Sequence, residues 1–159
     1  MTSKIFIAAS LAVLCLFNVS IYQKEQIRQN GDTVLLELAP VDPRSLMQGD
    51  YMRLRYKAAA ALPQDSSLPA HGQLVIAVDH DRVGSYRRVD NNAPLQSSEK
   101  KMKYGRTGIV PDSFLFQEGQ ADTYRRAKYG VFKFEGPDNY ILVGLADENR
   151  KPLAAPVTP

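Results

Sequence analysis

The sequence predicts a mainly β protein, in which an N-terminal transmembrane helix precedes one antiparallel β-sandwich or barrel-like domain with one or two short helices. Two observations support this prediction. A single uncharged apolar run lies near the start of the chain, and the later runs are short, alternating and separated by turn residues. The chain has 159 residues, so about 130 remain after the apolar run, enough for one hydrophobic core.

The apolar run covers residues 5–22 and contains no charged residue. As a helix it measures about 27 Å, close to the thickness of the hydrocarbon core of a bilayer. A cleaved signal peptide needs small residues before the cleavage site, and residues 18–22 do not provide them. A lipoprotein needs a small residue directly before its cysteine, and Cys15 is preceded by Leu14. A buried core helix is disfavoured because the run is apolar all round. We therefore expect an uncleaved signal anchor that contacts the membrane lipid bilayer through residues 5–22.

The charges that flank the apolar run are nearly balanced. Lys4 precedes the run, and Lys24 and Arg28 follow it, so the excess of positive charge on one side is small. A very short N-terminal tail usually stays in the cytoplasm, like the first part of a signal peptide. We expect a single-pass protein of the inner (cytoplasmic) membrane, with the N-terminus inside and the domain in the periplasm or outside the cell.

The rest of the chain is divided by turn residues into short β-rich runs. Residues 23–30 form a polar stalk, helical or extended, that ends at a turn. Strands are expected at Thr33–Leu38, Tyr51–Tyr56, Gln73–Val78, Tyr86–Val89, Lys101–Arg106, Phe114–Phe116, Gly130–Phe134 and Tyr140–Leu145. Short helices are expected at Ala58–Leu62 and Gln120–Lys128, the second with Tyr124 and Ala127 against the sheet. The last two strands flank a Gly-Pro-Asp-Asn turn and are expected to form a hairpin.

The organisation that follows has three parts. Residues 1–29 form the membrane anchor and stalk, residues 30–151 form the β-domain, and residues 152–159, rich in Pro and Ala, form a disordered tail. The strand expected at 51–56 alternates clearly, with Met52, Leu54 and Tyr56 on one face. It is predicted to be half-buried.

One segment carries a recognisable signature, made of Gly49, Asp50, Tyr51, Leu54 and Tyr56. It resembles the motif of the GDYXXLXY family of bacterial membrane-anchored proteins, and all its fixed letters match. The stretches at 40–44, 116–119, 127–130 and 142–145 are also similar to that family. The resemblance implies an N-terminal anchor, a GDYXXLXY-type β-domain at 30–151, no catalytic residues, and a role beside multi-pass membrane proteins.

The motif has two interpretations. In the first, it determines the fold, because Gly49 can adopt a positive φ in a turn and Asp50 can cap that turn. In the second, Tyr51, Arg53 and Arg55 form a surface that recognises another protein. The two remain open at the level of sequence.

Catalytic and metal-binding readings find little support. The order of anchor, strand and motif distantly resembles type I signal peptidases, which place a nucleophilic Ser eight residues before the Gly, and Val41 stands there instead. The alternative that remains is a hydrolase to which Ser45 or Asp50 contributes. The run Asp79–Asp81 suits a polar hairpin tip better than a metal site, since neighbouring residues of a strand point to opposite faces. The single cysteine, in the apolar run, excludes a cysteine-based metal site. We expect no metal and no cofactor.

A basic excess lies between residues 82 and 106. This stretch contains only two acidic residues, Asp90 and Glu99. It contains seven basic residues: Arg82, Arg87, Arg88, Lys100, Lys101, Lys103 and Arg106. Such a region suits an acidic partner or anionic lipid headgroups, or it is simply a charged, solvated loop. No nucleic-acid-reading motif accompanies it, so nucleic acid is not expected. The sequence thus favours a non-enzymatic accessory protein with a multi-pass membrane partner over a hydrolase acting at the membrane surface.

Overall fold

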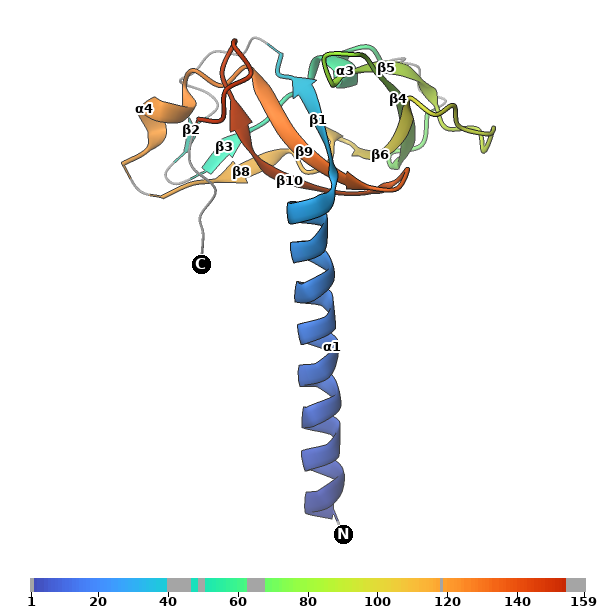
Figure 1. Cartoon of the computed structure of the whole chain (residues 1–159), viewed down its shortest axis with the longest axis vertical. Coiled ribbons are helices and arrows are strands. Elements are labelled where there is room, and N and C mark those ends of the chain that lie inside the picture. Colours follow the sequence, from blue (N-terminus) through green and yellow to red (C-terminus); the bar gives the residue numbers. More distant parts are fainter. Residues whose placement is uncertain (1, 40–46, 49–50, 63–67, 118, 154–159) are drawn as a thin grey trace.

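One long helix and a β-domain make up the chain (Figure 1). The computed structural model describes residues 2–39, 47–48, 51–62, 68–117 and 119–153. Helix α1 (Thr2–Asn30) projects from one side of the domain as a single rod (Figure 1). Residues 23–30, expected to form a helical or extended stalk, belong to this helix. Within the described part of the chain, no helix combines the length and the apolarity needed to cross a membrane.

The last turn of α1 is fixed to the domain. Ile27 is buried, and its carbonyl accepts a hydrogen bond from the Gly31 N–H at 2.9 Å. A methyl group added at Gly31 would lie 2.5 Å from that carbonyl oxygen and 2.9 Å from the carbonyl oxygen of Phe134. Only glycine therefore fits where the helix passes into the first strand.

Seven strands form one curled sheet in the order β10-β9-β1-β5-β4-β6-β7. They are β1 (Asp32–Glu37), β4 (Gly72–Val78), β5 (Val83–Val89), β6 (Glu99–Gly105), β7 (Gly108–Ile109), β9 (Tyr129–Glu135) and β10 (Asn139–Ala146). Neighbouring strands are antiparallel except β1 and β5, which are parallel. The prediction of a mainly β domain is confirmed, and the expected hairpin is the pair β9–β10.

The curled sheet brings β10 next to β6. The Tyr140 hydroxyl accepts a hydrogen bond from the Lys103 N–H at 2.9 Å and donates one to the Val110 carbonyl at 2.8 Å. The Lys101 N–H donates to the Pro137 carbonyl at 2.7 Å. These bonds connect the two ends of the sheet and satisfy backbone groups that an open edge would leave exposed.

A second, smaller sheet has the order β2-β3-β8. It contains β2 (Met47–Gln48), β3 (Tyr51–Arg53) and β8 (Ser113–Leu115), of which β2 was not predicted from the sequence. Two one-turn helices, α3 (Lys57–Ala60) and α4 (Ala121–Tyr124), lie where short helices were expected, and both are shorter than expected.

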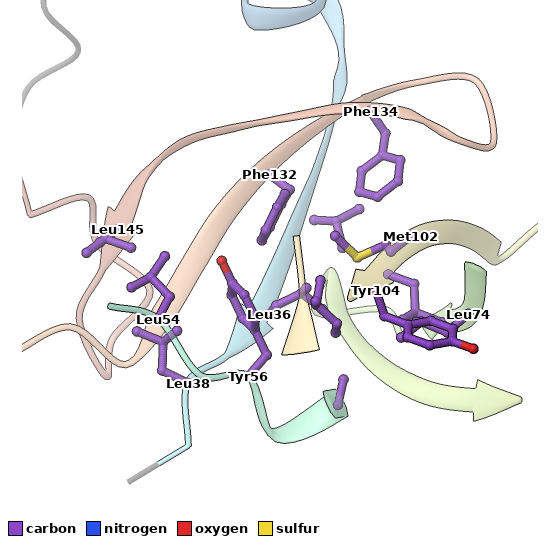
Figure 2. Packing of buried hydrophobic residues seen from close by; sticks show 14 of the residues in the cluster. Leu36, Leu38, Leu54, Tyr56, Leu74, Met102, Tyr104, Phe132, Phe134 and Leu145 are labelled. Atoms are coloured by element: carbon purple, nitrogen blue, oxygen red, sulfur yellow. The ribbon is translucent and has the colours of Figure 1, made fainter. Parts of the chain in front are cut away.

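The core fills the space enclosed by the curled sheet (Figure 2). Leu36, Leu74, Phe132 and Phe134 are at most 1% exposed. Burying a side chain of this size stabilises the fold by about 1.5–3 kcal/mol. Aromatic rings pack together at one side, where Tyr140 lies 5.8 Å from the Phe132 ring and 5.1 Å from the Phe134 ring.

The C-terminal part of the domain extends slightly beyond the expected limit. Pro152 forms a β-bridge with Ala146, and the Leu153 N–H donates to the Leu145 carbonyl at 3.0 Å. Backbone pairing with β10 thus reaches the first two residues of the predicted tail, whose remaining residues lie outside the described ones.

Candidate functional site

The motif strand connects the two sheets. Its first part, β3, pairs with β8, and the Leu54 N–H donates to the Asp112 carbonyl at 2.7 Å. Its last part reaches β1, because the Arg55 carbonyl accepts a bond from the Ala39 N–H at 2.7 Å and Tyr56 bridges to Leu38. This crossing explains why β3 ends at Arg53, three residues before the end of the predicted strand.

The expected alternation of the strand is confirmed. Met52, Leu54 and Tyr56 are 5%, 2% and 1% exposed, respectively, whereas Arg53 and Arg55 are exposed and Tyr51 is half-buried. Of the three fixed positions that the structure describes, Leu54 and Tyr56 therefore lie in the core and Tyr51 is half-buried. Gly49 and Asp50 lie outside the described residues.

Tyr56 is the centre of the packing around the motif (Figure 2). Its hydroxyl donates to the Pro111 carbonyl at 2.8 Å, and its ring lies 5.7 Å from that of Phe132. Burial raises the pKa of Tyr56 far above its ordinary value, and the nearby Asp112 carboxylate adds to this rise. The hydroxyl thus anchors the ring to the backbone as a hydrogen-bond donor.

Three stretches that carry the family resemblance meet at this point. A methyl group added at Gly130 would lie 3.0 Å from Cε1 of Tyr56, 3.3 Å from Cε2 of Phe132 and 3.5 Å from Cδ1 of Leu142. Gly130 also pairs with buried Leu145 of β10. The motif, the stretch at 127–130 and the stretch at 142–145 therefore form one packing unit.

The outward side of the same strand forms a surface. Tyr51 lies opposite Leu115 and Arg53 opposite Ser113 in the β3–β8 pair, and directly opposite residues of a pair share a face. Leu115 is 79% exposed. We call the outward side chains of Tyr51, Arg53, Arg55 and Leu115 the motif face.

Sequence reasoning missed Leu115. It treated residues 114–116 as one apolar run, but the strand alternates, and Phe114 and Phe116 each pack against Tyr124 with ring centroids 5.2 Å apart. Tyr124 is buried and Arg125 and Arg126 are exposed, as expected for this helix. The available signal was the period of two, which forces the middle residue of the run outward.

The described residues provide no geometric support for the hydrolase or for a metal site. Ser45 and Asp50, proposed for a hydrolase, lie outside the described residues. Asp79 lies at a hairpin tip, where its Oδ1 accepts hydrogen bonds from the Asp81 and Val83 N–H groups at 2.9 and 2.7 Å. Among the residues that the structure describes, no group of His, Cys, Asp and Glu could hold a metal ion.

Much of the basic excess at 82–106 is used within the domain. Arg88 pairs with Glu99 at 2.7 Å and Lys101 with Asp90 at 2.7 Å, and both carboxyl side chains are almost completely buried. Lys100 pairs with Asp32 at 3.1 Å. The region is therefore less available to an acidic partner than its composition indicates.

Comparison with known proteins places the motif in a wider context. A family model described as GDYXXLXY protein matches residues 13–145, a range that includes the motif strand, the packing unit around Tyr56 and the motif face. No curated protein and no solved structure is detectably similar to the chain.

Proposed function

We propose that this chain, which belongs to the GDYXXLXY family, is a membrane-anchored, non-enzymatic binding module for another membrane protein. Residues 5–22 of α1 serve as a single-pass anchor in the inner membrane, with the N-terminus in the cytoplasm. The β-domain lies in the periplasm or outside the cell, and the motif face contacts a multi-pass membrane partner.

The exposed surface of α1 is the observation that carries the anchor. Ten large apolar side chains of this helix are at least 50% exposed, namely Phe6, Ile7, Leu11, Val13, Leu14, Leu16, Phe17, Val19, Ile21 and Tyr22. A surface of this kind needs an apolar environment. Ile5 and Ala8 of the anchor segment are not among the described side chains.

The polar residues within the apolar segment also suit a bilayer. The Ser10 hydroxyl donates to the Phe6 carbonyl at 2.9 Å, and the Asn18 amide donates to the Leu14 carbonyl at 2.8 Å. Both donors are thus satisfied by the helix itself, which lowers the cost of placing them in lipid.

The motif face supplies the contact for a partner. It combines an aromatic ring, two arginines and a leucine that is 79% exposed, and aromatic and Arg residues are enriched at protein interfaces. Strand β8 runs along the side of the domain from which α1 projects (Figure 1). On an anchored protein this side faces the membrane, so the parts of a multi-pass protein near the membrane surface lie within reach.

The anchor is tested with a cysteine reporter. In a Cys15→Ser background, Asp138→Cys places one thiol in the exposed turn between β9 and β10. Labelling of intact spheroplasts by a membrane-impermeant maleimide supports the proposed orientation. Labelling that requires lysis, or release of the protein from membranes by alkaline carbonate, contradicts it.

The partner is tested by affinity purification of the tagged full-length protein from gently solubilised native membranes, followed by mass spectrometry. The prediction is a stoichiometric multi-pass protein that is lost in the double variant Arg53→Glu/Leu115→Gln. The matched control is Arg87→Glu in β5, which changes an exposed strand arginine on the other sheet. Recovery of the protein alone from several detergents, or equal capture by both variants, contradicts the proposal.

A further inference from the structure

We propose that the hollow where α1 meets β1 is a binding site for a phosphate group, either free or in a lipid headgroup. The hollow has a volume of about 460 Å³ and begins at Gly31, directly after the last residue of α1. Sites for small molecules usually have volumes of about 300–1,000 Å³. The space is thus sufficient for a phosphate and the group that carries it.

The lining of the hollow is rich in donors. Arg82, Lys100 and Lys133 contribute three positive charges, and Ser97 and Ser98 contribute two hydroxyl groups. Asp32 is the one acidic residue among the lining residues, so the net charge of the lining is two positive units. Three basic side chains, two hydroxyl groups and a net positive charge among the lining residues match the oxygens of a phosphate.

Lys100 and Lys133 are held in place by hydrogen bonds that do not use all of their N–H donors. Lys133 Nζ donates to the Gly31 carbonyl at 3.0 Å. Lys100 Nζ donates to the Gly136 carbonyl at 2.9 Å and to Asp32 at 3.1 Å. Because an ammonium group has three N–H donors, each lysine retains capacity for an anion while its position is fixed by the backbone.

Asp32 marks the place where an anion would bind. Its side chain is 73% exposed although it pairs with Lys100, which is only 16% exposed. An exposed carboxylate on a half-buried lysine contributes little to stability, and a phosphate with more oxygens can displace it or bind beside it. Removing the Asp32 charge is therefore expected to strengthen binding of the anion.

Arg82 offers a clean way to weaken the site. Its φ is 63°, and Arg150 has the same φ of 63° but does not line the hollow. Asparagine tolerates this left-handed conformation better than other side chains with a Cβ. The variant Arg82→Asn thus removes a charge from the hollow without adding backbone strain, and Arg150→Asn is its matched control.

The test follows hydrogen–deuterium exchange of the peptides that contain residues 31–34 and 96–100 in the full-length protein. In one arm, inorganic phosphate is titrated into protein in a non-ionic detergent, which does not depend on the anchor. In the other, the protein is placed in nanodiscs of phosphatidylcholine alone or of phosphatidylcholine with phosphatidylglycerol. Protection by phosphate identifies a soluble ligand, and protection only with phosphatidylglycerol identifies a lipid headgroup.

Arg82→Asn is expected to weaken the protecting interaction about fivefold, the effect of one basic residue near an anionic surface. Asp32→Asn is expected to strengthen it, and Arg150→Asn to leave it unchanged. The inference is overturned if neither probe protects these peptides. It is equally overturned if Arg82→Asn and Arg150→Asn change protection to the same extent.

Discussion

Three tyrosines in or against the core differ in the hydrogen bonds that their hydroxyl groups make. Tyr56 donates to the Pro111 carbonyl, and Tyr140 bonds to both β6 and Val110. The Tyr104 hydroxyl is buried without a hydrogen-bond partner among the described residues. A buried hydroxyl that finds no partner gives up its bonds to water without compensation, so the three residues contribute differently to stability.

Replacing each tyrosine by phenylalanine separates these contributions. Tyr56→Phe removes the donor to a backbone carbonyl in the core and is expected to lower the free energy of unfolding by about 1–2 kcal/mol. Tyr104→Phe, which removes only an unpaired hydroxyl, is expected to be neutral or stabilising. Chemical denaturation of the detergent-solubilised protein measures the free energy of unfolding of both variants. An equal decrease in the two would contradict the difference in hydrogen bonding between Tyr56 and Tyr104.

Gly130 provides a second test at this scale. Gly130→Ala places a methyl group against the Tyr56 ring at 3.0 Å, and overpacking of this kind costs about 1–3 kcal/mol. Gly144→Ala in β10 is the control, because a methyl group there has no neighbour within 4 Å. Thermal unfolding measures the melting temperatures of the two variants. Similar values would show that the packing of Tyr56 does not require a glycine at position 130.

At the level of elements, two ion pairs cover the outer side of β4. Val75 pairs with Arg88 of β5 and with Lys101 of β6, and it is completely buried although it lies on the side opposite the core. Arg88 holds Glu99 across β4, and Lys101 holds Asp90. The stems of these long side chains can cover apolar surface while their charges are neutralised.

These pairs predict a pH dependence of stability. Hydrogen bonds from Arg88 and from the Gln96 N–H hold the pKa of Glu99 below its ordinary 4.5, and the bond from Lys101 lowers the pKa of Asp90. A carboxyl with a depressed pKa in the fold stabilises above its unfolded pKa and loses this contribution as pH falls through the folded value. The melting temperature is expected to fall below about pH 4.5.

The variant Glu99→Gln tests the source of this dependence. It is expected to be less stable than the natural chain at pH 7, and its melting temperature is expected to change less between pH 5 and pH 3. The control is Glu148→Gln, which changes an exposed glutamate in a turn. A Glu99→Gln variant whose pH profile parallels that of the natural chain would mean that other groups cause the acid sensitivity.

The elements also show how far sequence reasoning reaches. The hairpin β9–β10 was predictable because alternation and a Gly-Pro-Asp-Asn turn act within a few residues. The parallel pairing of β1 with β5 and the pairing of β3 with β8 were not, because each joins segments far apart in the chain. Leu115 was missed for a different reason: the period of two within residues 114–116 was a local signal, but the run was interpreted as uniformly apolar.

For the whole molecule, the inward and outward sides of one strand divide the motif into two roles. The inward residues Leu54 and Tyr56 join the two sheets, whereas the outward residues Tyr51 and Arg53 lie beside Leu115 on the motif face. The fixed letters therefore fall on both sides of the strand: Leu54 and Tyr56 lie in the core, whereas Tyr51 lies on the motif face.

The most direct test of this account is site-specific photo-crosslinking in living cells. A photoreactive amino acid is placed at Leu115 on the motif face and, as a control, at exposed Ser85 of β5, which lies in the other sheet (Figure 1). We predict one discrete crosslinked product to a membrane protein from position 115 and none from position 85. Absence of a product at 115, or the same products from both positions, would contradict a partner on the motif face.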